Sequence, residues 1–145
     1  MNYKIISIIT IPTDDSGSLS YFEASRDISF CIKRIYFIAN VPKDKKRGYH
    51  AHKKLKQLLF CPYGEVLITL DDGQLKDEIL LNTPEKGILI EEPLWREILW
   101  IKDSSVLCVA ASDYYDPNDY IRDYRDFLHY RNLLNTKRSS YMQEE

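Results

Sequence analysis

Short apolar runs separated by turn-forming residues fill the first 112 positions of the chain. The runs are rich in Ile, Val, Tyr and Phe, a composition typical of β-strands. Gly, Pro and Asp between them supply the left-handed or proline-fixed corners of tight turns. The spacing of these turns is typical of sandwiches and jelly rolls, and it predicts an all-β fold. The predicted strands cover residues 3–11, 19–23, 32–38, 58–61, 65–70, 78–81, 87–90, 97–101 and 105–111.

The last fifth of the chain follows a different period. Asp116 and Pro117 are residue types favoured at a helix N-cap and at the first helical position. After them, aromatic and aliphatic residues recur at helical spacing as far as Leu134. We therefore expect one amphipathic helix that packs on the β-domain. The residues that follow are polar, so the sequence predicts a single domain over 1–134, helix included, and a disordered tail over 135–145.

Length, charge and cysteine content narrow the class of protein. A chain of 145 residues fits one domain. Twenty Lys and Arg against 22 Asp and Glu leave a formal net charge of -2, which gives no overall field to attract nucleic acid. No apolar run approaches the roughly 20 residues that span a bilayer. Cys31, Cys61 and Cys108 lie in apolar segments, so we expect buried, reduced thiols in a cytoplasmic protein that binds neither nucleic acid nor membrane.

The most informative segment is 47–52, which reads Arg-Gly-Tyr-His-Ala-His. Alternate residues of a strand point to the same face, so the imidazoles of His50 and His52 are expected to project together. His129 is the only other histidine in the chain. An imidazole with an ordinary pKa near 6.5 can take and return protons near neutral pH. The pair therefore indicates acid/base chemistry.

Paired histidines in a β-domain also suggest a metal site, and the spacing argues against one. The pair is followed after four residues by Gln57 and later by Gly64, which matches the first cupin motif except that Gln replaces the carboxylate ligand. A neutral amide binds a divalent cation more weakly than a carboxylate does. Ile98 occupies the position of the histidine ligand in the second cupin motif and cannot bind a metal. With two of the four ligands missing, we expect neither a metal nor any other cofactor.

A pair of free imidazoles suits the movement of a ketone to the neighbouring carbon. This isomerisation needs a base for the proton on the hydroxyl-bearing carbon, a proton shift between two oxygens, and proton delivery to the former carbonyl carbon. Tyr36 and Tyr49 are candidate hydroxyl donors. Arg47, Lys33 and Arg34 are candidates for binding a diphosphate through charge-assisted hydrogen bonds.

Several motifs in one register resemble a known family, the cupin-fold sugar 3,4-ketoisomerases. They lie between residues 5 and 130 and comprise Gln57 and the segments 32–36, 47–53, 70–73, 93–95 and 111–115. The resemblance implies a cupin-type jelly-roll barrel with a C-terminal helix. It implies conversion of dTDP-4-keto-6-deoxyglucose to its 3-keto isomer, ahead of a transaminase that makes a 3-amino-3,6-dideoxy sugar for a surface polysaccharide or a glycosylated metabolite. It also implies a homodimer, often with exchanged N-terminal strands.

The resemblance assigns roles residue by residue. Catalysis falls to His50, His52 and Tyr36, while Arg47 lies beside the sugar and diphosphate. Two positions depart from the family pattern, because Arg96 stands where many members have His, and Ser16 stands where many have Arg. We expect these two positions to help decide from which face C4 is protonated. The candidate substrate-binding residues are therefore Arg47, Lys33, Arg34, Tyr49, Gln57, Arg96 and Ser16.

Other functions compete with this interpretation. Epimerases of the same keto sugar act at C3 or C5 on a related barrel, but they pair one His with an Asp and a Tyr, so the second alternating His argues against them. The missing metal ligands also fit a non-catalytic cupin that binds a sugar. A metal-dependent oxygenase would need a metal that these ligands do not favour.

Overall fold

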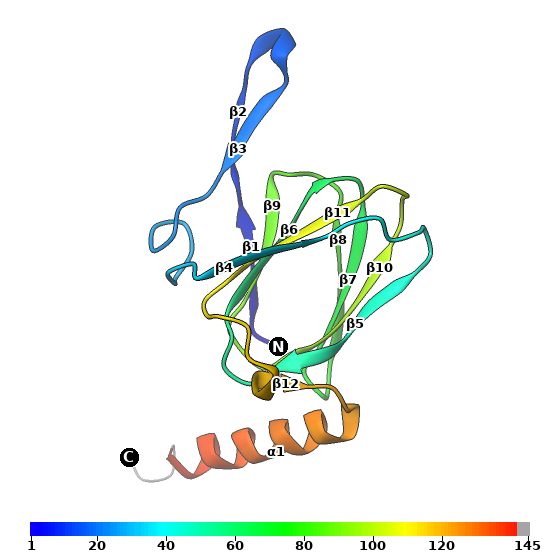
Figure 1. The fold of residues 1–145 in the computed structure, drawn as a ribbon. Helices are drawn as coiled ribbons and strands as arrows, with labels where there is room; N and C mark the ends of the chain where they lie inside the picture. Colours follow the sequence, from blue (N-terminus) through cyan, green and yellow to red (C-terminus); the bar gives the residue numbers. More distant parts are fainter. Residues whose placement is uncertain (142–145) are drawn as a thin grey trace.

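The computed structural model of this chain describes residues 1–141. Strands fill most of the described chain up to residue 121, and one long helix follows them (Figure 1). Two 3-10 turns are present, η1 (Asp14–Ser16) and η2 (Pro117–Asp119), and the helix is α1 (Tyr124–Tyr141). The strands are β1 (Tyr3–Ser7), β2 (Ile9–Pro12), β3 (Ser18–Tyr21), β4 (Arg34–Ile38), β5 (Lys46–His52), β6 (Gln57–Tyr63), β7 (Val66–Asp71), β8 (Lys76–Leu81), β9 (Lys86–Ile90), β10 (Trp95–Trp100), β11 (Val106–Ala111) and β12 (Tyr120–Ile121).

Two antiparallel five-stranded sheets form a sandwich. One has the strand order β1-β9-β6-β11-β4, and the other has the order β12-β5-β10-β7-β8. Among the described strands no ladder joins one sheet to the other, so the barrel is not closed by strand pairing. The hairpin β2–β3 is a separate two-stranded sheet that extends away from the sandwich (Figure 1). The predicted all-β fold with a C-terminal helix is confirmed.

The main core lies between the two sheets. Inward-facing apolar residues from both sheets are almost fully excluded from water, as expected where two sheets pack face to face. Trp100 is fully buried there, and its indole N–H donates to the carbonyl oxygen of Ser105 at 3.0 Å. A second cluster involves the irregular segment before β4, whose Ile28 and Phe30 group with Leu58 of β6. Strands covered on both faces explain why several of the runs are continuously apolar.

The helix begins later than the sequence predicts. Asp116 is an N-cap, since its carboxylate accepts the amide N–H of Asn118 at 2.9 Å, but it caps only the single turn η2. The chain then extends and pairs with β5 as β12, so that Tyr120 lies opposite His52. The predicted helix start at Pro117 is therefore wrong, because pairing with β5 competes for the residues that follow the first turn.

Helix α1 also differs from the prediction at its far end. It starts after Asp123, whose carboxylate accepts two amide N–H groups of the first turn at 2.8 and 3.1 Å. The helix continues through residues 135–141, which the sequence assigned to a disordered tail. In this stretch Arg138 pairs with Glu92 at 3.0 Å, and that contact ties the helix to the segment before β10. The rest of the predicted tail, 142–145, lies outside the described residues.

The exposure of the cysteines and the character of the helix bear on two expectations drawn from composition. Cys61 in β6 is buried and Cys108 in β11 is half-buried, but Cys31 is exposed. The expected burial of Cys31 is wrong, because the residue lies in the irregular segment before β4, where apolar neighbours in sequence do not place it under a sheet. In the described part of the chain, no helix combines the length and the apolar character needed to cross a membrane.

Candidate active site

A bulge in β5 brings the candidate residues to one cavity. In the pairing of β5 with β10, Arg96 lies opposite His50, and the next residue of β10 lies opposite Gly48. Tyr49 is the extra residue, and both it and Gly48 have positive φ, 55° and 96°. A Cβ at Gly48 would lie 2.8 Å from the carbonyl oxygen of Arg96, so the position requires glycine. The bulge lets Arg47 line the same cavity as His50 although the two are three positions apart.

The two imidazoles are in contact. Their ring centroids are 5.0 Å apart, with an angle of 87° between the planes. Nδ1 of His50 lies 3.1 Å from the carbonyl oxygen of Gly48, and Nδ1 of His52 lies 3.1 Å from the carboxylate of Asp119. Carbonyl and carboxylate oxygens only accept hydrogen bonds, so each neutral ring carries its proton on Nδ1 and keeps its lone pair on Nε2. The structure thus brings the pair together, as the strand alternation predicts.

Both rings are held in the neutral form. Burial and then the charge of Arg96 lower the pKa of His50 from 6.5 to about 4. The same two causes, followed by smaller effects of His50, Arg34 and Arg122, lower the pKa of His52 to about 2. Nε2 of His52 is buried and has no hydrogen-bond partner within residues 1–141. Because a neutral imidazole is the form that accepts a proton, both rings are bases at neutral pH.

A buried polar chain runs beside the histidines. Arg96 is only 3% exposed, and its guanidinium donates to the side-chain oxygen of Gln57 and, at 3.3 Å, to the carbonyl oxygen of Leu94. The amide group of Gln57 donates in turn to the hydroxyl oxygen of Tyr36 at 3.0 Å. Burial raises the pKa of Tyr36, so its hydroxyl stays protonated and can donate. Burial lowers the pKa of Arg96 to about 10, which still leaves it charged at neutral pH.

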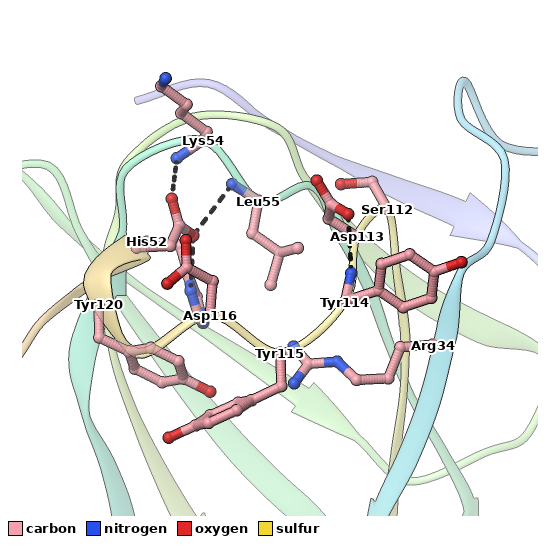
Figure 2. Close-up of a pocket in the computed structure, with 11 residues that line it drawn as sticks. Arg34, His52, Lys54, Leu55, Ser112, Asp113, Tyr114, Tyr115, Asp116 and Tyr120 are labelled. Carbon is pink, nitrogen blue, oxygen red and sulfur yellow. Dashed lines mark hydrogen bonds and ion pairs between the residues drawn. The ribbon is translucent and has the colours of Figure 1, made fainter.

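Two pockets adjoin at Tyr120. His52 lines a pocket of about 240 Å³ together with Arg34 and Tyr115 (Figure 2). Tyr120 lines this pocket and also a cavity of about 290 Å³ beside it. Its ring centroid lies 5.1 Å from that of His50 and 4.4 Å from that of His52, so the candidate site comprises both pockets. The polar lining of the cavity is provided by Tyr36, Arg47, His50, Arg96, Tyr120 and Arg122.

The remaining candidate residues are not all at the site. Arg34 lines the pocket of Figure 2. Lys33 is exposed and pairs at 3.4 Å with Asp113, which belongs to that pocket. Tyr49 is 46% exposed at the bulge and is not among the residues that line either pocket. Ser16 is exposed at the tip of the β2–β3 hairpin, which projects from the sandwich, so the structure does not bring it to the histidines (Figure 1).

The sequence pattern does not indicate three residues of the site. Asp119 ends η2, Tyr120 starts β12, and Arg122 follows β12, with its guanidinium 4.3 Å from the centroid of the Tyr120 ring. The helical spacing after Pro117 predicts that Tyr120 belongs to the apolar stripe of a helix. A strand of two residues shows no alternation, so no periodic signal marks it. The only unusual feature is the density of charged and aromatic residues between 113 and 124.

The donor set does not fit a cupin metal ion. Within residues 1–141, no three His, Cys, Asp or Glu side chains group together as ligands. Gln57, at the position of the carboxylate ligand, is bonded to Arg96 and Tyr36. Ile98, at the position of the last histidine ligand, is a buried part of the apolar core. A guanidinium close enough to depress both histidine pKa values would also repel a divalent cation.

Comparison with known sequences finds relatives over almost the whole chain. The family described as "FdtA: WxcM-like, C-terminal" matches residues 1–132. The TDP-4-oxo-6-deoxy-alpha-D-glucose-3,4-oxoisomerase of Aneurinibacillus thermoaerophilus is 40% identical over 138 residues. That alignment covers 95% of this chain and 99% of the relative.

Solved structures agree with the sequence matches. A 3,4-ketoisomerase from Helicobacter canadensis has a TM-score of 0.86 and 42% identity, covering 91% of this chain and 98% of its own. QdtA, a sugar 3,4-ketoisomerase from Thermoanaerobacterium thermosaccharolyticum solved with TDP, also has a TM-score of 0.86 and 42% identity. The match covers 90% of this chain and 95% of QdtA. A mutant of that enzyme was solved with TDP-4-keto-6-deoxyglucose. The chain therefore belongs to the FdtA (WxcM-like, C-terminal) family and is one of the cupin-fold sugar 3,4-ketoisomerases.

Proposed function

We propose that the protein moves the keto group of dTDP-4-keto-6-deoxy-D-glucose from C4 to C3 by metal-independent acid/base catalysis. The observation that carries this proposal is the pair of imidazoles with ring centroids 5.0 Å apart, each with Nδ1 placed against an oxygen acceptor. The substrate is supported by the name of the Aneurinibacillus relative and by the sugar bound to the Thermoanaerobacterium mutant. Two bases beside a hydroxyl donor and a buried cation match the proton transfers of a ketone shift.

The proposed reaction passes through an enediol. Nε2 of one imidazole takes the proton from C3, the electron pair forms the C3–C4 double bond, and negative charge develops on O4. The buried Arg96 cation stabilises that charge where little water competes with it. A proton then moves from O3 to O4, and the free hydroxyl proton of Tyr36 can mediate the transfer. The imidazolium returns a proton to C4, the carbonyl forms at C3, and the protein regains its starting protonation state.

Arginines around the two pockets match the diphosphate of the nucleotide. Arg47 lines the cavity of His50, and Arg34 lines the adjoining pocket. A planar guanidinium can make two parallel hydrogen bonds to phosphate oxygens. We therefore assign the diphosphate to these two arginines, with Lys33 at the rim. Gln57 acts on the sugar indirectly, through its hydrogen bonds to Tyr36 and Arg96.

Incubation with the sugar nucleotide in D2O tests the proposed function. An isomerase incorporates deuterium at C4 of a 3-ketone. An epimerase incorporates deuterium at C3 or C5 and leaves the ketone at C4, and a sugar-binding cupin gives no labelling above background. NMR spectra of the recovered sugar distinguish the three results, and either of the last two would contradict the proposal.

Activity should survive mild acid. Because burial and Arg96 depress the pKa of His50 to about 4 and that of His52 to about 2, kcat/KM should not fall between about pH 7.5 and 5.5. An imidazole with its ordinary pKa would be roughly 90% protonated at the lower pH. The unfolded chain takes up protons near pH 6.5 while the folded chain does not, so the free energy of unfolding should decrease below that pH. A kcat/KM profile with an apparent pKa near 6.5 would contradict the assignment.

Arg96 is expected to influence the configuration of the product at C4. It is buried in the cavity wall beside the histidines, where many family members have His. A change of donor at this position alters which face of the enediol receives the proton. We expect the Arg96→His variant to yield a different ratio of gluco to galacto product, measured by NMR. Unchanged stereochemistry in an active variant would remove Arg96 from that role and leave the isomerase reaction standing.

We propose a homodimer in which the N-terminal strands pack on a second copy. The edge strand β4 exposes Ile35 (63%) and Phe37 (70%), and exposed apolar patches of this kind mark interfaces. Strand exchange would also carry Ser16 to a neighbouring site. Light scattering coupled to gel filtration measures the assembly, and a monomer would contradict this proposal. The projecting hairpin adds four apolar side chains with 38 to 54% exposure, namely Ile9, Ile11, Leu19 and Tyr21.

The biosynthetic setting is part of the same proposal. A 3-keto sugar nucleotide is the form that a transaminase needs to make a 3-amino-3,6-dideoxy sugar, which we assign to a surface polysaccharide. The three free cysteines of the described chain agree with a cytoplasmic location, where thiols stay reduced.

A further inference from the structure

Asp119 is fixed against the turn that follows β5. Its carboxylate accepts the amide N–H of Lys54 at 2.8 Å and that of Leu55 at 3.3 Å. Its carbonyl oxygen accepts the amide N–H of Lys53 at 2.9 Å. A carboxylate held by this set of backbone bonds has little freedom to rotate. The remaining contact of the carboxylate is with Nδ1 of His52, at 3.1 Å.

This contact decides which nitrogen of His52 is the base. A carboxylate offers no proton, so the neutral ring must place its own proton on Nδ1. The lone pair then lies on Nε2, which is buried and has no partner within residues 1–141. Only 1% of the His52 side chain is exposed. His52 lines a pocket whose wall also contains Tyr120 and Arg34 (Figure 2).

His52 and His50 differ in the acceptor behind them. Nδ1 of His50 faces the neutral carbonyl of Gly48, whereas Nδ1 of His52 faces a negative charge. A proton taken up by His52 therefore creates an ion pair with Asp119, and a hydrogen bond between charged groups is stronger than one to a neutral acceptor. The cations near His52, which resist its protonation, come from β10, β4 and the end of β12, namely Arg96, Arg34 and Arg122. Asp119 is the acidic group that offsets them at Nδ1.

We propose that Asp119 is a positioning residue of the isomerase, which holds His52 in the Nδ1–H tautomer and stabilises its imidazolium when Nε2 takes a proton from the sugar. This inference rests on the proposed function, and it assigns His52 as a ring on which positive charge develops. The arrangement parallels the acid, histidine and substrate order of hydrolase triads, where the acid orients the ring without being protonated itself.

The Asp119→Asn variant tests the proposal. The amide oxygen should keep the shorter bond from the Lys54 N–H, which turns the amide NH2 toward Nδ1 of His52. His52 must then accept at Nδ1, and its proton moves to Nε2. We expect kcat to fall by roughly 10²–10⁴-fold, with KM unchanged because the interaction matters only as the proton is transferred. Asp126→Asn, an exposed carboxylate of α1, is the matched control and should leave kcat unchanged.

A spectroscopic measurement separates positioning from simple structural damage. Long-range ¹H–¹⁵N spectra of histidine-labelled protein report the tautomer of each ring, and His52→Asn identifies the His52 signals. We expect the Nδ1–H tautomer in the wild type and the Nε2–H tautomer in Asp119→Asn. An Nε2–H tautomer in the wild type would overturn the proposal without any variant, so the test holds even if Asp119→Asn does not fold.

Activity measurements distinguish a failure of the proposed role of Asp119 from a failure of the proposed isomerase function. A wild-type protein that isomerises the sugar, with Asp119→Asn equally active, would overturn the role of Asp119 and leave the proposed function intact. A wild-type protein that gives no 3-ketone would overturn the proposed function, and the role of Asp119 in it would fall as well.

Discussion

Replacement of His52 or of His50 by asparagine should lower kcat by about 10²–10⁴-fold, the range that general acid/base catalysis contributes. Asparagine keeps a polar side chain of smaller size but has no group that accepts a proton near neutral pH. The two rings are in contact, and both are neutral because burial and Arg96 depress their pKa values. Since they serve one sequence of proton transfers, the double variant should lose little more than either single variant.

Formation of the 3-ketone, followed by NMR, measures these losses, and calorimetry with dTDP shows whether the nucleotide still binds. His129→Asn is the control, because this third histidine is exposed on α1. Its kcat should match that of the wild type. A loss of less than about tenfold in either single variant would exclude that ring from the proton transfers.

Phe127→Ala should cost about 3–5 kcal/mol of unfolding free energy, as expected when a buried aromatic side chain is removed. Phe127 is fully buried and joins α1 to the sheet through a cluster with Ala51, Trp95 and Ile121. Ala51 lies between the two histidines, and Ile121 pairs with it as part of β12. The variant should therefore lose activity as well as stability, because its cluster supports the strand that carries Tyr120.

Urea unfolding measured by tryptophan fluorescence gives the free energy. Leu133→Ala is the matched control on the same helix, since this leucine is 49% exposed. Its effect should stay within about 0.5 kcal/mol, as for most surface substitutions. If Phe127→Ala matched the control, the helix would contribute little to the fold, and the site would have to be supported by the sheets alone.

The sequence is sufficient to predict most strands and the pairing of the histidines. Apolar runs and turn residues mark β6, β7, β9, β10 and β11 because these strands are buried between turns that need Gly, Pro or Asp. The contact of His50 with His52 follows from alternation in β5, downstream of the bulge. Local geometry of this kind depends only on neighbours in the chain.

The parts of the site that the sequence does not reveal depend on tertiary contacts. Arg47 would face away from His50 in a regular strand, and only pairing with β10 shows that Tyr49 is bulged. Asp119 and Tyr120 look like the start of a helix until β12 is seen to pair with β5. Nothing in the pattern of either segment distinguishes these outcomes, because each is decided by a strand distant in sequence.

The bulge at Gly48 and Tyr49 makes the inner face of β5 tolerant of losing one residue. The inward and outward alternation of its side chains shifts by one position at the extra residue. Arg47 and the histidines all face inward only because of this shift. Deleting Tyr49 would remove the bulge and leave Arg47 two positions before His50 in a regular strand, where alternation keeps both on the inner face. A natural variant that loses the Tyr49 codon would thus keep its acid/base groups and the arginine on the same face of β5.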